Sequence, residues 1–121
     1  MEIVIIAALA GSALIHLIPL VGVLGPSRVV RMYDVAVDGP DMSVLLQHRA
    51  VLFGLLGTAL VAAMFREDAR PYVIGAVLVS DIAFLVIAAL NPGLNASMKR
   101  VVRADVISIA LLVIAGVGVL T

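Results

Sequence analysis

The sequence has no cysteine, no tryptophan and few charges. The lack of cysteine excludes disulfides, thiol redox chemistry and thiolate metal sites. Aromatic residues make up only 4% of the chain, which argues against an aromatic cage for a quaternary cation. Eight basic side chains balance eight acidic ones, so no net positive field attracts phosphates. We therefore expect neither a thiol enzyme nor a nucleic-acid-binding protein.

Apolar residues are what the chain has in abundance. They form 64% of its 121 residues, and the mean hydropathy is +1.25. An average soluble domain is roughly half apolar, and a chain this short buries a small fraction of its surface. A soluble monomer of this composition would expose large apolar patches and aggregate. The composition therefore predicts a domain built within a membrane.

Four apolar segments are long enough to cross a bilayer, which takes about 20 helical residues. We predict an all-α fold, a four-transmembrane-helix antiparallel bundle, because short connections make consecutive helices neighbours. Residues 28–35 combine basic and apolar side chains, which predicts a short interfacial helix between the first two spans. Gly39-Pro40-Asp41 is typical of a turn before the second span. The whole chain, 1–121, forms one integral membrane domain with predicted helices at about 3–24, 44–65, 71–90 and 101–120.

Lysine and arginine predict the orientation, because cytoplasmic connections carry an excess of them. The connections 25–43 and 91–100 are the richer in basic residues, whereas the opposite side carries only Arg66 and Arg70. We expect both connections in the cytoplasm and both termini outside, in a bacterial inner (plasma) membrane. The basic residues on the richer side also suit anionic lipids, and they are Arg28, Arg31, Lys99, Arg100 and the nearby Arg103.

Ionisable groups at membrane depth are costly and are functional candidates by default. Counted from the cytoplasmic helix ends, Arg49 lies about 8 Å deep, His16 about 12 Å and Asp81 about 14 Å. An ion pair between Arg49 and Asp81 is within reach if their helices are neighbours, and His16 could join it. These three residues are the predicted ligand or proton site. The alternative is a buried ion pair that only fixes the order of the helices.

Five further polar or helix-breaking residues are secondary candidates. Ser12 and Pro19 share a face with His16, and Pro19 leaves the carbonyl of Ile15 without its helical partner. His48 lies about 100° round the helix from Arg49, so we expect it to face another surface. Arg103 and Asp105 open the last helix, where snorkelling and the helix dipole also explain them. The histidine spacing indicates no metal site.

Small residues predict where helices touch, because they let backbones approach closely. Ala50, Gly54, Thr58 and Ala62 recur every four residues in the second span. Packing within a monomer is the simpler explanation, and a homodimer face is the alternative.

Three stretches carry a resemblance to a known group: Gly11-Ser-Ala-Leu-Ile-His16 with Pro19, Gly22-Val-Leu-Gly25, and Leu46-Gln-His-Arg-Ala-Val-Leu-Phe-Gly54. The chain resembles small bacterial four-helix membrane proteins that are loosely DoxX-like in size and helix count. Similar sequences sometimes carry the label phosphopantetheine adenylyltransferase, but the Thr/His-x-Gly-His nucleotide motif of that soluble enzyme is absent here. The small multidrug-resistance transporters also have four helices, but they use a glutamate in the first helix that this chain lacks.

These observations favour a protein that binds or transports a small amphiphile, such as a lipid or quinone, through a polar intramembrane pocket. A non-catalytic accessory or assembly subunit of a larger membrane complex is one alternative, and a proton-coupled transporter or channel is another. An enzyme with His16 as general base is weaker, because no nucleophile or oxyanion donor accompanies the histidine. We expect membrane lipids as partners, no cofactor, no metal and no nucleic acid.

Overall fold

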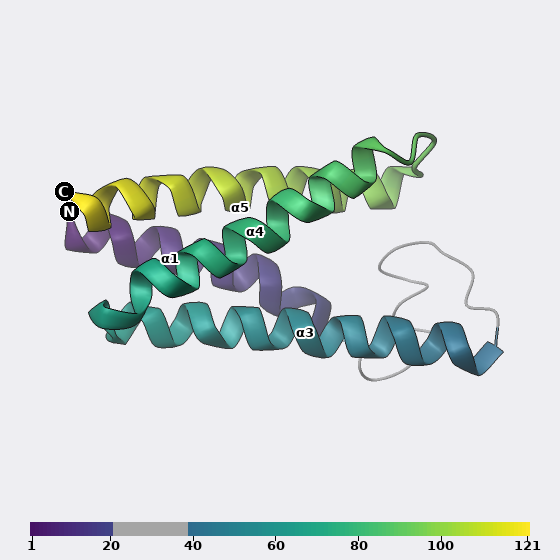
Figure 1. Cartoon of the computed structure of the whole chain (residues 1–121), viewed down its shortest axis with the longest axis horizontal. Helices are drawn as coiled ribbons and strands as arrows, with labels where there is room; N and C mark the ends of the chain where they lie inside the picture. Colours follow the sequence, from purple (N-terminus) through teal and green to yellow (C-terminus); the bar gives the residue numbers. More distant parts are fainter. Residues whose placement is uncertain (21–38) are drawn as a thin grey trace.

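The computed structural model describes residues 1–20 and 39–121, and every regular element in these two ranges is helical (Figure 1). The long helices are α1 (Glu2–Leu17), α3 (Gly39–Phe65), α4 (Arg70–Ala89) and α5 (Ala96–Leu120). A short 3₁₀ turn, η2 (Glu67–Ala69), joins α3 to α4. All four long helices are long and apolar enough to cross a membrane, which supports an integral membrane protein.

The four helices form a ring in which each packs against two others. α1 contacts α3 and α5, and α4 contacts the same two helices from the opposite side. The two chain ends lie together at one end of the molecule (Figure 1). There the Met1 sulfur is 3.2 Å from the position that a Cβ on Gly118 would occupy.

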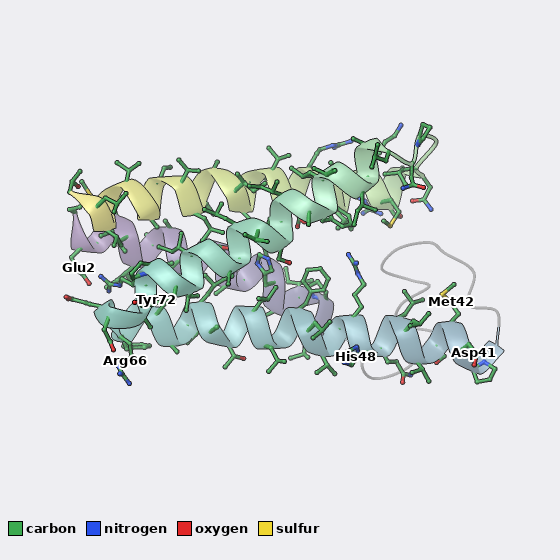
Figure 2. All side chains as sticks on the ribbon, in the orientation of Figure 1. Glu2, Asp41, Met42, His48, Arg66 and Tyr72 are labelled. Carbon is green, nitrogen blue, oxygen red and sulfur yellow. The ribbon has the colours of Figure 1, made fainter. Side chains whose placement is uncertain are left out.

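Large apolar side chains fill the centre and also cover the outside. Leu9, Leu60, Val77 and Leu112 are fully buried, one from each helix. The outward faces carry apolar side chains along their length (Figure 2), and a water-soluble protein would not tolerate so many. The hydrophobic surface therefore faces lipid, as the composition predicts.

Glycine brings α1 and α3 close together. A Cβ on Gly57 would lie 2.6 Å from Leu17, and a Cβ on Gly54 would lie 2.6 Å from Leu20. The predicted four-residue stripe follows this contact only at its start, because Thr58 and Ala62 are exposed. The contact face drifts round the helix because 3.6 residues per turn do not match a strict repeat of four.

Three predicted helix boundaries differ from the structure. α3 begins at Gly39 rather than near residue 44, so the predicted turn at residues 39–41 lies within the first turn of the helix, where Gly39 has a φ of +84°. α5 begins at Ala96 rather than near residue 101, because the Asn95 side chain accepts a hydrogen bond from the Met98 amide and caps the helix. α1 ends at Leu17 and continues as a 3₁₀ turn through residue 20, since Pro19 has no amide hydrogen. The predicted interfacial helix at 28–35 lies outside the described residues.

The α3–α4 connection is short and contains only Arg66 and the 3₁₀ turn η2. Arg66 donates two hydrogen bonds to Asp68, and these raise the pKa of Arg66 above its ordinary value. Both side chains are about two-thirds exposed or more, so this pair adds little to stability.

Candidate functional site

A buried polar cluster lies in the centre of the bundle. His16 on α1 and Asp81 on α4 are joined by a 2.8 Å hydrogen bond between Nε2 and Oδ1, and neither side chain is more than 1% exposed. Since α1 and α4 are not neighbours in the ring, this bond crosses the bundle from one side to the other. The Ser12 and Ser108 hydroxyls, 2.7 Å apart, link α1 to α5 beside it.

The second ring nitrogen of His16 determines where the protons of this pair lie. Nδ1 is 2.8 Å from the Ser12 carbonyl oxygen, and a carbonyl only accepts, so Nδ1 carries a hydrogen. Nε2 then either donates a second hydrogen to a carboxylate or accepts one from a carboxylic acid. In both cases one proton lies between Nε2 and Oδ1. Without it, two lone pairs would face each other at 2.8 Å.

The other oxygen of Asp81 makes no contact that offsets its burial. Oδ2 is buried and has no hydrogen-bond partner among the described residues. Burying an unpartnered polar atom is costly, so the bond from Oδ1 to His16 is the contact that compensates for the burial of this side chain.

Arg49 does not form the predicted ion pair with Asp81. Its guanidinium lies over two aromatic rings, 4.8 Å from the centre of Phe53 and 5.2 Å from that of Phe84. Asp81 instead pairs with His16. Counting residues gives the depth of a side chain along the helix axis but not the direction in which it points. The predicted depths therefore helped to find the residues, whereas the predicted pairing of Arg49 with Asp81 was wrong.

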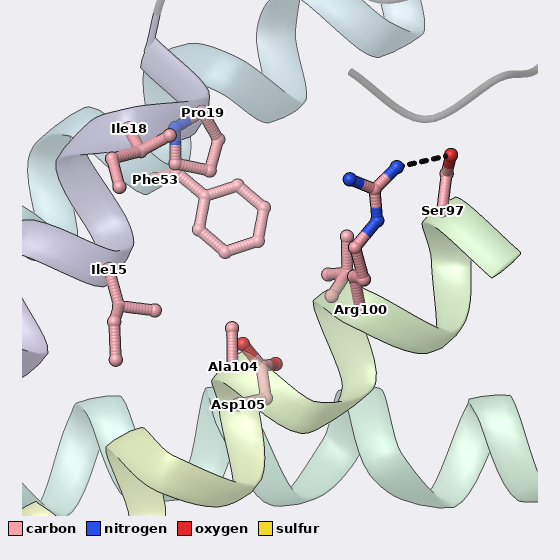
Figure 3. Close-up of a pocket in the computed structure, with 9 residues that line it drawn as sticks. Ile15, Ile18, Pro19, Phe53, Ser97, Arg100, Ala104 and Asp105 are labelled. Carbon is pink, nitrogen blue, oxygen red and sulfur yellow. Dashed lines mark hydrogen bonds between the residues drawn. The ribbon is translucent and has the colours of Figure 1, made fainter.

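A pocket of about 210 Å³ lies beside the cluster, between α1, α3 and α5 (Figure 3). Asp105 forms part of its floor, and the figure shows its carboxylate directed into the open space. Asp105 is only 3% exposed, and no hydrogen bond from residues 1–20 or 39–121 reaches it. Arg100, whose guanidinium donates to the Ser97 hydroxyl, lies on another side. The rest of the lining is apolar and consists of Ile15, Ile18, Pro19, Phe53, Val101 and Ala104.

The secondary candidates separate into two groups. Ser12 lies in the buried cluster, and Pro19 and Asp105 line the pocket. His48 and Arg103 are exposed, so neither belongs to the cluster or the pocket. Figure 2 shows His48 on the outer side of α3, as its position on the helix predicts.

Sequence reasoning missed a second buried charge at the other end of the bundle. Arg70 was counted as a loop residue, but it is only 4% exposed. It donates two hydrogen bonds to the Glu2 carboxylate, at 2.7 and 2.9 Å, and further ones to the carbonyls of Ala63 and Met64. The last carbonyls of a helix lack partners within the helix and need donors from elsewhere. That need was the signal in the sequence that could have indicated a role for Arg70. Arg70 therefore ties the end of α3 to the start of α1.

The described residues include no group of three or more histidine or acidic side chains arranged to hold a metal ion. Comparisons with known protein families, with curated proteins and with solved structures give no match. The functional argument therefore rests on the geometry of the cluster and the pocket.

Proposed function

We propose that this membrane protein binds or transports a small amphiphile whose head enters the pocket between α1, α3 and α5. One observation carries the proposal: the pocket has apolar walls and two ionisable residues, Asp105 and Arg100, at different places on its lining. Ligand sites combine these features, since the apolar wall supplies affinity and a few polar groups fix orientation.

The volume limits the head to about one ring. A cavity of about 150 Å³ accommodates benzene, whereas pockets for whole drug-sized ligands span about 300–1,000 Å³. At about 210 Å³, this pocket suits a substituted ring or a small lipid head. A hydrocarbon tail would extend into the bilayer.

The neighbouring residues support the pocket from behind. Phe53 forms part of the wall. Its ring centre is 5.8 Å from that of His16, and the Arg49 guanidinium lies over the same ring. His16 and Asp81 hold α1 and α4 in place across the bundle. In this proposal, Arg49, His16 and Asp81 shape the site, while Asp105 and Arg100 meet the ligand.

The proposal includes an antiparallel bundle in a bacterial inner membrane, with both termini outside and an interfacial helix between α1 and α3. The charges at the two ends support this orientation. Arg66 and Arg70 are both held in ion pairs, whereas Arg100 at the other end donates to a hydroxyl. The chain has no cysteine, so single cysteines at Thr121 and Ser97 can be labelled without background. An impermeant maleimide applied to intact cells should label the first and spare the second.

A filled-pocket variant tests the amphiphile function. Ala104→Leu places a larger side chain in the pocket, and Ala110→Leu makes the same change at an exposed site on the same helix. We expect native mass spectrometry from mild detergent to show a retained small molecule with the wild-type protein and Ala110→Leu but not with Ala104→Leu. Equal retention by both variants would contradict a ligand in this pocket.

Proton coupling is a second candidate, supported by the proton between His16 and Asp81. If ligand binding moves that proton, binding heats measured in buffers of different ionisation enthalpy should differ for the wild-type protein. Asp81→Asn should remove the difference. The same heat in every buffer would argue against coupling.

A further inference from the structure

We infer that the ligand presents a hydrogen-bond donor, an O–H or N–H group, to the Asp105 carboxylate at the floor of the pocket. This inference rests on the proposed function and specifies the chemistry of the ligand head. It assigns Asp105 a role as the residue that determines ligand specificity.

The state of Asp105 carries the argument. The residue is 97% buried, yet no hydrogen bond from the described parts of the chain reaches its carboxylate. Buried polar groups in proteins are almost always satisfied, and an unsatisfied carboxylate is among the costliest. Its carboxylate is directed into the pocket rather than into a neighbouring helix (Figure 3). A ligand is therefore the natural source of the missing partner.

Within residues 1–20 and 39–121, the polar side chains near Asp105 donate elsewhere. Ser12 and Ser108 are bonded to each other, and both nitrogens of His16 are engaged by Ser12 and Asp81. Arg49 lies close enough to Asp105 to interact electrostatically, but its guanidinium lies over the rings of Phe53 and Phe84. Arg100, on another side of the pocket, donates to the Ser97 hydroxyl.

The apolar walls make the pocket more selective for a ligand head that carries a donor. A head with a donor satisfies the carboxylate of Asp105, whereas a head with only acceptors leaves that carboxylate without a partner. Sites built to pair a buried polar group reject analogues that lack the partner far more strongly than apolar pockets reject a change of size. A hydroxyl of a phenol or hydroquinone and the ammonium of an amine both supply such a donor.

Matched probes test the inference on the full chain in detergent. We would measure the affinities of para-octylphenol, its methyl ether, para-octylbenzylammonium and an octyl-substituted benzoquinone by titration calorimetry. The phenol should bind roughly tenfold or more tightly than the ether, the factor expected for one hydrogen bond to a charged group. Tighter binding of the phenol than of the ammonium identifies a hydroxyl head, and the reverse identifies a cationic one.

Two substitutions at Asp105 provide the control. The preference for phenol over ether should fall in Asp105→Asn and disappear in Asp105→Leu, which keeps the site filled. Wild-type protein that binds phenol and ether equally, or quinone as tightly as phenol, would overturn the inference.

If the proposed function itself is wrong, the same experiments give a different result. If no probe binds, or if Ala104→Leu binds the probes as well as Ala110→Leu does, the pocket is not the site and both proposals fall. Probes that bind in the pocket without discrimination would leave the amphiphile function standing and overturn only the role of Asp105.

Discussion

Replacing His16 by alanine should destabilise the protein much more than replacing Asp81 by asparagine, although both substitutions remove an ionisable group from the same hydrogen bond. His16→Ala deletes the bridge between α1 and α4 and leaves Asp81 without any partner. In Asp81→Asn the amide group can donate to Nε2, because the Ser12 carbonyl keeps the hydrogen of the ring on Nδ1. The bridge then survives without the shared proton.

The expected loss of unfolding free energy follows from the contacts that each variant loses. A hydrogen bond between membrane helices contributes about 1–2 kcal/mol at most. The fully buried imidazole would also leave a cavity, which adds about 2 kcal/mol by comparison with other buried side chains cut to alanine. His16→Ala should therefore cost roughly 3–4 kcal/mol, whereas Asp81→Asn, which preserves shape and hydrogen bond, should cost about 1 kcal/mol or less.

Reversible unfolding in mixed micelles measures both values, and the double variant completes a thermodynamic cycle. The two effects should not add, because the partners share one interaction. Equal costs for the two single variants, or additive costs in the double variant, would refute the assignment of the proton between Nε2 and Oδ1.

Two further pairs of substitutions test the packing. Gly57→Ala should destabilise the protein by about 1–3 kcal/mol, because its Cβ would overlap Leu17, whereas Gly75→Ala has open space and should stabilise it by about 0.5–1 kcal/mol. Guanidine titration in bicelles would rank the two, and the same sign for both would contradict the close α1–α3 contact. Arg70→Ala should lower the melting temperature well below that of Arg66→Ala, because only Arg70 is buried and bonded to helix-end carbonyls. Similar melting temperatures in circular dichroism would show that the Arg70 clamp does not stabilise the fold.

The sequence alone predicts the helices well, because hydropathy and length decide which segments can span a membrane. Their first turns were missed where local contacts extend a helix beyond its apolar part. Asn95 caps α5, which begins five residues before the predicted start, and α3 begins in a polar stretch at Gly39, whose φ is positive. Such contacts depend on side-chain geometry that composition does not record.

At the candidate site, prediction from the sequence fails for a different reason. Burial cost correctly singled out His16 and Asp81 as residues to examine, but the partner of each depends on the order of helices around the ring. The prediction paired Arg49 with Asp81 because α3 and α4 are consecutive. The pairing across the ring arises only when α1 and α4 face each other, and the pocket above Asp105 arises only when α1, α3 and α5 are placed together. The buried Arg70 was missed for the same reason, since its partner Glu2 is 68 residues away.

The meeting of Met1 with the last turn of α5 has a practical consequence for engineering. A short linker could join residue 121 to residue 1, and new ends could be opened in the turn at residues 91–95, at the far end of the molecule (Figure 1). Such a circular permutant keeps the ring of helices intact while moving the attachment points for tags and reporters from one face of the membrane to the other.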